Sequence, residues 1–423
     1  MKSRAYRAVD VNRIDCEEWL GGRGRSVVHA GLDIGKEWIF CALRWGAGNF
    51  DRPWRVGNPF DVVRLAELLA AVGHGRQLIV AMEPTGTYGD AARQALARAG
   101  VVVHRVSPKM ASDYAEVFDG VPSQHDGKDA AVVAELGAQG KSWPWPLPTP
   151  SAAEQELVYQ VRWLDDQRRQ WMQWCGRVEA LLSRHWPEAT RIVPLRSGMI
   201  IACLAEYGGP RGLAGASDAL ARVQRWGGTF LSEEKARAFV ASAASTVGVA
   251  LSRWDEELLR QYARQMQGCR RAMSAARRRL KVLTRDQAAI QAMSAVVGIG
   301  TACVLWVELG DPSRYHCGAA FRKAMGLNLA ERSSGQWQGT LKISKRGSSQ
   351  VRRWLYLAAL RWLKHEPVRS WYLRQKARRR GEGKPAVIGV MRKLALVLYR
   401  VGGRGAAFDR QQLYRAVISA NPA

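Results

Sequence analysis

The sequence predicts an α/β domain at the N-terminus, a long helical coiled-coil hairpin after it, and a mainly helical domain at the C-terminus. Short apolar segments alternate with helix-like segments before residue 141, which is typical of an α/β sheet covered on both faces. A proline-rich segment, SWPWPLPTP, occupies residues 142–150, and heptad-like apolar patterns follow it. Together these three observations give the order of the domains along the chain.

The α/β domain is predicted over residues 26–141. Two β-rich stretches around a turn open it (VVHAGLDIGKEWIFCALRW), and two buried strands (RQLIVAM and VVVHRV) flank a helix that ends at Gly100. A further helix starts near Asp126. Residues 1–25, which end in GGRGR, are predicted to be a flexible arm, and residues 142–150 a linker.

Two segments, 151–190 and 250–290, are predicted to form the hairpin. Apolar residues recur in steps of three and four in both segments, as in the seam of a coiled coil. Each helix is expected to run for on the order of 35 residues, or about 50 Å. Residues 191–249 between them form an insertion to which the sequence assigns no role. The two seams comprise Leu157, Val161, Leu164, Arg168, Trp171, Cys175, Val178 and Leu182 in the first helix, and Tyr262, Met266, Cys269, Met273, Ala276, Leu280 and Leu283 in the second.

The C-terminal domain is predicted over residues 293–423. Its first part, VVGIGTACVLWVELGD, indicates two helices joined by a turn bounded by glycines. A later helix carries basic residues on one side, and a basic tail contains KARRRGEGK.

The charge of the chain is large and unevenly distributed. The formal net charge is +27, which usually marks a polyanionic partner, with nucleic acid the first candidate and an anionic membrane surface the second. Residues 26–140 carry 11 basic and 13 acidic side chains, whereas residues 320–423 carry 23 basic and 4 acidic ones. An acidic catalytic module beside a phosphate-binding module explains this division better than a solvated surface does.

Several classes of protein are disfavoured. The chain has no apolar run long enough to cross a membrane, and its N-terminus lacks the features of a secretory signal. The 7 cysteines are scattered without a CxxC pair, which argues against a zinc site or a disulfide framework. A cytoplasmic protein that does not bind membranes is expected.

Four acidic residues stand at positions suited to metal binding: Asp33 in GLDIGK, Glu83 in AMEPTG, and Asp126 and Asp129 in HDGKD. The first two lie at strand ends, and the other two, three residues apart, share one face of a helix start. Oxygen ligands without His or Cys indicate Mg²⁺ or Mn²⁺. Each acid also has a purely structural interpretation: Asp33 as a turn residue, Glu83 as a solvated strand end, Asp126 as a helix N-cap and Asp129 as a partner of the helix dipole.

Nucleic-acid contacts are predicted in the C-terminal domain. Gly298 and Gly300 lie in a turn between helices, where backbone N–H groups can hold phosphates as in a helix–hairpin–helix motif, although a simple turn fits equally well. Trp337 and Trp354 stand among basic residues, an arrangement that suits stacking on unpaired nucleotides. The basic strip consists of Lys342, Lys345, Arg346, Arg352 and Arg353.

Two sets of motifs resemble transposases of the insertion-sequence 110/1111 family. The first set is GLDIGK, AMEPTGTYG, VSPKMASDYAEVFDG and HDGKDAAVVAEL, and the second runs from GIGTACVLWVELGD to SKRGSSQVRRWLYLAA. The resemblance covers roughly residues 26–190 and 293–365. It implies a ribonuclease-H or Holliday-junction-resolvase-like fold for the N-terminal domain, and a C-terminal domain that carries DNA-binding residues and a catalytic serine.

The resemblance also implies a mechanism. Asp33, Glu83, Asp126 and Asp129 would be the DEDD acids that bind Mg²⁺. Ser334, directly before Gly335, would attack DNA and form a covalent phosphoserine, with Ser333 as the alternative. The partners implied are donor and target DNA, a structured non-coding bridge RNA, and further copies of the chain, as a dimer that assembles to a tetramer. The family further implies a prokaryotic, nucleoid-associated protein.

Other functions remain open at the level of the residues. A metal-dependent junction resolvase or nuclease would use water as nucleophile and need no serine. A non-enzymatic DNA- or RNA-binding protein would use the acids structurally, and Ser333 and Ser334 would then lie in an ordinary loop. A phosphatase or sugar-kinase-like enzyme fits the basic C-terminal segment poorly. The insertion 191–249, the basic tail and the N-terminal arm depart from the family pattern and leave the subgroup undetermined.

Overall fold

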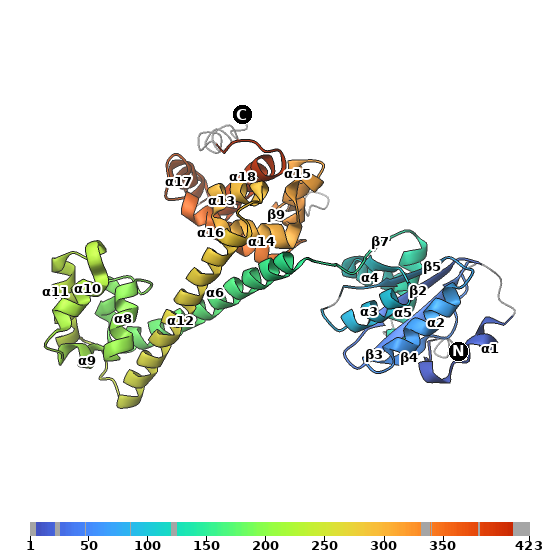
Figure 1. Ribbon diagram of the computed structural model, residues 1–423. Helices are drawn as coiled ribbons and strands as arrows, with labels where there is room; N and C mark the ends of the chain where they lie inside the picture. The colour runs from blue at the N-terminus through green and yellow to red at the C-terminus, as the bar shows by residue number, and fades with distance from the viewer. Residues whose placement is uncertain are drawn as a thin grey trace. The chain divides into compact units, whose positions relative to one another are not determined.

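The computed structural model describes residues 6–21, 26–46, 48–84, 86–119, 125–330, 339, 341–379 and 381–408 (Figure 1). The chain divides into two compact units, Met1–Thr149 and Pro150–Ala423. The first unit contains a mixed sheet and the second is almost entirely helical. This agrees with an α/β N-terminal domain followed by a mainly helical remainder.

The first unit is built on a sheet whose described strands follow the order β1-β4-β3-β2-β5-β6-β7. Strands β2, β5 and β6 run parallel, while β3 is antiparallel to both of its neighbours. This mixed sheet fits a ribonuclease-H-like fold. The strands span Val9–Asp10 (β1), Val28–Ile34 (β2), Trp38–Trp45 (β3), Trp54–Gly57 (β4), Leu78–Met82 (β5), Val103–Val106 (β6) and Ser142–Pro144 (β7).

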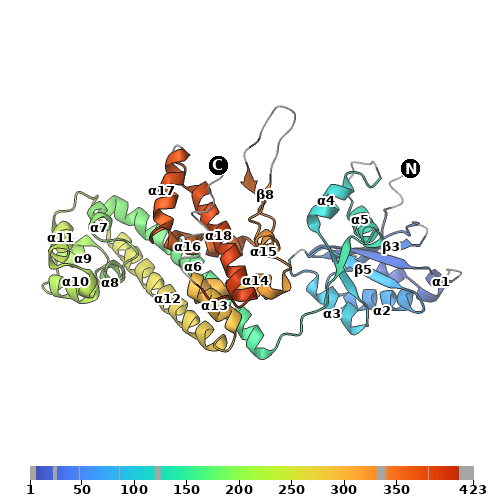
Figure 2. The same ribbon diagram turned by 90° about the horizontal axis from the view of Figure 1, so that it is seen from above.

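Helices cover both faces of this sheet (Figure 2). Helices α2 and α3 pack on one face, where Leu65 and Leu96 share a core with Val28 and Val80. Helices α4 and α5 pack on the other face, where Val133 of α5 contacts the cluster around Val106. The helices span Cys16–Leu20 (α1), Val62–Gly73 (α2), Asp90–Arg98 (α3), Pro108–Ala115 (α4) and Asp126–Ala138 (α5).

Gly31 allows α5 to lie directly against β2. A Cβ atom at this position would stand 2.0 Å from the carbonyl oxygen of Ala130 and 2.3 Å from the amide nitrogen of Ala134. Both of these are backbone atoms of α5, so they cannot move aside without moving the helix. The absence of a side chain at Gly31 therefore sets how closely the two elements approach.

The prediction of a flexible arm over residues 1–25 is wrong for the part of this segment that the structure describes. Val9 and Asp10 form β1, which pairs in parallel with β4, and a 3-10 helix (Val11–Arg13) and α1 follow. Val11 and Ile14 are buried in the core of the sheet. The hydrophobic stabilisation from burying these apolar side chains exceeds the loss of conformational entropy of the segment, so the segment folds onto the domain.

The linker predicted for residues 142–150 is also shorter than expected. Ser142–Pro144 form β7, antiparallel to β6, and the amide of Trp145 donates to the carbonyl of Val103 at 2.7 Å. The guanidinium of Arg93 lies 3.5 Å from the centre of the Trp145 ring and donates to the carbonyls of Trp145 and Pro146. Strand pairing and this cation–π contact therefore hold the segment against the sheet as far as Pro146.

The second unit is organised around two long helices, α6 (Ala152–His185) and α12 (Arg253–Leu283), which pack along each other. They run antiparallel, because Leu157 shares a cluster with Leu280, and Leu182 shares another with Leu259. Ser151 caps α6 in a reciprocal capping box with Glu154. The residues of the predicted seams are buried, except that Arg168, Trp171, Tyr262 and Leu283 are half-buried.

The segment 191–249 forms a helical subdomain at the end of the hairpin that contains the C-terminus of α6 and the N-terminus of α12 (Figure 1). Its side chains build a core with that end of both helices, and the rings of Trp186 and Phe239 pack against each other in a tilted arrangement within it. The helices at this end span Pro187–Ile192 (α7), Gly198–Tyr207 (α8), Pro210–Ala214 (α9), Ala219–Gly227 (α10) and Glu233–Ala244 (α11), with a 3-10 helix at Gly228–Phe230.

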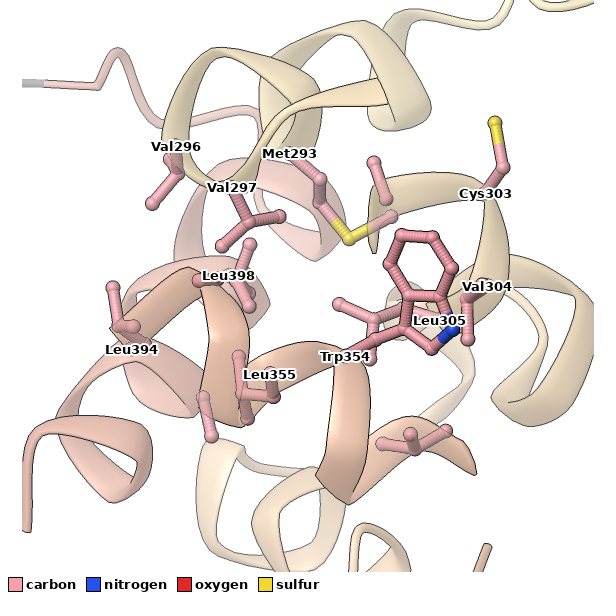
Figure 3. Close-up of a cluster of buried hydrophobic side chains, with 14 of the residues drawn as sticks. Met293, Val296, Val297, Cys303, Val304, Leu305, Trp354, Leu355, Leu394 and Leu398 are labelled. Carbon is pink, nitrogen blue, oxygen red and sulfur yellow. The ribbon is translucent and has the colours of Figure 1, made fainter. Parts of the chain in front are cut away.

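The C-terminal helices form a separate core at the other end of the hairpin (Figure 3). Figure 3 shows Trp354 beside Leu305 and Val304, with Leu394 and Leu398 on the opposite side. The elements are α13 (Ala288–Val297), α14 (Ile299–Leu309), a 3-10 helix (Pro312–Arg314), α15 (Gly318–Ala324), β8 (Leu329–Ala330), β9 (Lys342–Ile343), α16 (Ser349–Trp362), α17 (Val368–Arg378) and α18 (Lys384–Gly403).

Asp165 joins the hairpin to the C-terminal helices. This residue of α6 is buried, and its carboxylate accepts hydrogen bonds from the Arg353 guanidinium at 2.5 Å and from Nε1 of Trp354 at 2.7 Å. A buried carboxylate needs such partners to offset the loss of water. The contact fixes α16 against α6 from a residue that the heptad pattern does not mark.

Candidate metal centre

Three of the four predicted acids converge in the first unit. Asp33 is the penultimate residue of β2, and Asp126 and Asp129 occupy the first turn of α5. One carboxylate oxygen from each lies within 4.8 Å of the other two. The close contact at Gly31, two residues before Asp33, brings the start of α5 to this strand end.

Glu83 lies beside this group. It directly follows β5, and Met82 of β5 pairs with Leu32 of β2, so Glu83 and Asp33 extend from adjacent parallel strands. The charge of Glu83 contributes to raising the pKa of Asp33. Its oxygens are outside the 4.8 Å grouping, so Glu83 stands at the edge of the cluster.

The electrostatics of the cluster favour a cation. Burial, followed by the charges of Asp129, Asp126 and Glu83, raises the pKa of Asp33 to about 6. Burial and then Asp126 raise the pKa of Asp129, and burial and then Asp129 raise the pKa of Glu83. Within the described ranges, no lysine or arginine forms an ion pair with any of the four carboxylates. Partly buried carboxylates that repel one another fit a site for a hard divalent cation.

The structural interpretations of two acids are wrong in detail. The N-cap of α5 is His125, so Asp126 is the first residue of the helix and not its cap. Asp33 lies within β2, where it pairs with Phe40 of β3, and not in the turn that follows. Neither position requires an acid for capping or for a turn.

The sequence did not indicate the network that holds the start of α5. The buried Lys128 forms an ion pair with Asp119 at 2.7 Å, and the hydroxyl of Tyr6 donates to the same carboxylate at 3.0 Å. Burial, then the hydrogen bond to Asp119, raises the pKa of Tyr6 to about 12. A lysine between the two helical acids reads as another exposed charge, so only the fold reveals that it anchors the helix.

The turn between α13 and α14 lies where the sequence placed it. Gly298 is exposed and has φ = +79°, a conformation that favours glycine. Gly300 is buried, and a Cβ atom there would lie 3.1 Å from Leu164 and 3.2 Å from the Trp354 ring. Gly298 is exposed, but its own N–H donates to the carbonyl of Ser294 at 2.8 Å, and Gly300 serves the close packing of α14.

The five bases of the predicted strip divide into two groups. Arg352 donates to the carbonyl of Gly347 at 2.9 Å, and Arg353 is paired with Asp165. Lys342, Lys345 and Arg346 are exposed. These last three remain the stronger predictions for phosphate contacts.

Trp354 is 4% exposed, and its Nε1 donates to Asp165. Its predicted role in stacking on nucleotides is therefore wrong, because the ring lies in the core (Figure 3). Ser333, Ser334 and Trp337 lie outside the described residues, in the sequence between β8 and β9.

Two family models match separate parts of the chain. The DEDD transposase model of the IS110 group matches residues 30–187, and the model described as the transposase IS116/IS110/IS902 family matches residues 291–374. The chain belongs to the IS110 family of transposases. The first match of this transposase includes all four acids, and the second includes both candidate serines. A search among curated proteins gave no significant match.

Family membership gives the transposase its general activity. It implies an enzyme that acts on DNA, and the DEDD acids imply a divalent metal. None of the helices in the described ranges combines the length and the apolar character needed to cross a membrane.

We expect Mg²⁺ to raise the melting temperature of the transposase more at about pH 7.5 than at about pH 5. Burial and neighbouring acids raise the pKa of Asp33 to about 6. Below that pH the Asp33 carboxyl is protonated in the folded protein, and a cation must displace this proton in order to bind. The unfolded chain loses this proton at about pH 4, so the metal-free fold loses stability as the pH rises from about 4 through about 6. Differential scanning fluorimetry with and without Mg²⁺ at both pH values measures the effect. An equal rise at both would contradict it.

Proposed function

We propose that this transposase cleaves, exchanges and rejoins DNA strands with Mg²⁺ or Mn²⁺, and that the hydroxyl of Ser334 attacks the DNA. The observation that carries the proposal is the cluster of Asp33, Asp126 and Asp129, with Glu83 beside it. Three converging carboxylates, with that of Glu83 at the edge of the cluster, would provide the oxygen ligands that phosphodiester chemistry requires.

The roles of the residues follow from their chemistry. Bound divalent cations would stabilise the charge on the attacking and leaving oxygens of the phosphodiester. Asp33 and Asp129 would hold such cations in their ionised forms. The serine oxygen forms a bond to phosphorus and gives its proton to solvent. The bond from phosphorus to one deoxyribose oxygen breaks, and that oxygen takes up a proton and becomes a free hydroxyl. The resulting phosphoserine keeps the energy of the phosphodiester, so a free DNA hydroxyl can reverse the step on a new strand without ATP.

The serine is preferred over water because of where the two family matches fall. One includes the acids and the other the serines, although 205 residues separate Asp129 from Ser334 in the sequence. If water were the nucleophile, the acidic unit would be sufficient and the enzyme would be a junction resolvase or nuclease. That alternative is an outcome of the experiment below.

A trapped covalent adduct tests the proposal. The full-length protein is incubated with a labelled four-way DNA junction and Mg²⁺, denatured, and resolved by electrophoresis. We expect a labelled protein band that Ser334→Ala abolishes, that Ser333→Ala retains, and that EDTA prevents. Cleavage without an adduct would establish water as the nucleophile. An adduct that Ser334→Ala retains and Ser333→Ala abolishes would establish Ser333 instead.

We also propose that the serine and the acids of one active site come from different subunits of a dimer or tetramer. A mixture of Ser334→Ala and Asp33→Ala subunits should then recover cleavage that neither variant has alone. The guide for donor and target DNA is proposed to be a structured RNA encoded beside the gene. Strand exchange that proceeds equally without this RNA would contradict its role.

A further inference from the structure

Helix α12 carries an unusual concentration of positive charge. Residues 258–285, which include most of α12 and the start of the turn after it, hold nine basic side chains and no acidic one. Three of these bases have a carboxylate partner: Arg260 pairs with Glu257, Arg279 with Glu156 and Arg285 with Asp286. Arg264, Arg270, Arg271, Arg277 and Arg278 are exposed, and the described residues offer none of them a carboxylate partner.

Three of the unpaired bases, Arg264, Arg271 and Arg278, stand on the face of α12 that points away from α6. The buried seam includes Met266 and Met273, and a residue two positions before a seam residue lies about 200° around the helix from it. Arg264, Arg271 and Arg278 therefore form a row opposite the seam, with about 10.5 Å between successive members.

A groove lies along this row, between α12 and the start of α8. It has a volume of about 790 Å³ and is lined by Gly198, Ile201, Gln267, Arg270, Arg271, Ala272, Ser274, Ala275 and Arg278. Gly198, the first residue of α8, lets Arg270 approach closely, since a Cβ there would lie 3.0 Å from the guanidinium. The polar groups of Gln267 and Ser274 add hydrogen-bond donors between the arginines.

We infer that this groove binds the sugar–phosphate backbone of duplex DNA outside the catalytic centre. Arginine suits phosphate oxygens because its planar fork donates two hydrogen bonds at once. Duplex DNA carries one negative charge per about 1.7 Å of its axis, so Arg271 and Arg278 face several phosphates over their separation. The small side chains of Ala272 and Ala275 leave room for the backbone. DNA is the occupant because the family acts on DNA, and the inference rests to that extent on the proposed function.

Arg277, directly before Arg278, lies near Arg361 and the turn at Gly298. Burial, and then the nearby charge of Arg277, lowers the pKa of Arg361 in α16. Arg361 in turn donates to the carbonyl of Val297, directly before Gly298. Positive charge thus continues from α12 to the exposed glycine of the turn.

The salt dependence of DNA binding tests the inference. Binding of the full-length protein to a labelled duplex of arbitrary sequence is measured by fluorescence anisotropy over a range of salt, with EDTA present so that no strand is cut. Each phosphate contact contributes about 0.9 to the slope of log K against log salt. We expect the Arg271→Gln/Arg278→Gln variant to lower this slope by about 1.8 and to weaken binding at low salt. The Arg271→Lys/Arg278→Lys variant should restore most of the slope.

Arg279→Gln is the matched control, because it removes the same charge from the next residue but one already paired with Glu156. It should leave the slope unchanged. An unchanged slope in the Arg271→Gln/Arg278→Gln variant, or an equal loss of slope in Arg279→Gln, would contradict DNA binding in the groove. So would a loss confined to duplex RNA, measured in parallel. No strand is cut in this binding assay. If adduct formation fails, the proposed function is therefore contradicted, but the inference of DNA binding in the groove is not.

Discussion

Asp33→Asn should reduce metal-dependent DNA cleavage by about a hundredfold or more. The substitution keeps the size of the side chain but removes the charge at the centre of the cluster, where oxygens of Asp126 and Asp129 lie within 4.8 Å. Initial rates of cleavage of a labelled junction, measured at saturating Mg²⁺ and at about pH 7.5, give the ratio.

The same variant should be more stable than the native protein when no metal is present. Burial and three like charges raise the pKa of Asp33, which means that they disfavour its ionised form in the fold. An amide relieves that cost. Glu67→Gln on α2, an exposed position in the same unit, is the control and should change neither rate nor stability. Near-native cleavage by Asp33→Asn would show that the cluster is not the catalytic centre.

Gly31→Val should abolish cleavage and lower the free energy of unfolding of the first unit by about 3 kcal/mol or more. The new Cβ would meet backbone atoms of α5 at 2.0 Å and 2.3 Å, so the helix must move away from β2. That movement carries Asp126 and Asp129 away from Asp33. Denaturant unfolding followed by circular dichroism, together with the junction assay, measures both effects.

Gly137→Ala provides the matched control in the same layer. A Cβ at Gly137 of α5 would lie 3.4 Å from the Cβ of Ala81, an ordinary contact. Alanine also favours the helix by about 1 kcal/mol over glycine, so this variant should retain cleavage and gain stability. If Gly31→Val cleaved DNA at the native rate, the position of α5 would not control the site.

Most of the candidate metal centre could be predicted because each of its acids stands in a recognisable local pattern. Asp33 and Glu83 end apolar strand-like segments, and Asp126 and Asp129 are spaced to share one face of a helix. The two long helices could be predicted equally well, since the apolar residues of each seam repeat over about thirty residues. Patterns of this length outweigh the preferences of single residues.

The remaining features depend on contacts between distant segments. Asp165 reads as an exposed acid on α6, yet Arg353 and Trp354, from a helix about 190 residues later, bury it. Gly31 reads as an ordinary strand residue until α5 crosses it. The N-terminal residues read as an arm because their strand has only two residues, too few to show an alternating pattern. No local signal distinguishes these cases from their more common alternatives.

The two cores at opposite ends of the α6–α12 hairpin have an evolutionary consequence. The distal core is closed by Trp186, Phe239 and neighbouring side chains, and Trp171 packs against both it and the C-terminal core. We therefore expect substitutions in the core around Trp186 and Phe239 to be accommodated there, without repacking the helices that flank the candidate serines in the sequence. We expect relatives of this transposase to differ more in the subdomain of residues 191–249 than in the C-terminal helices.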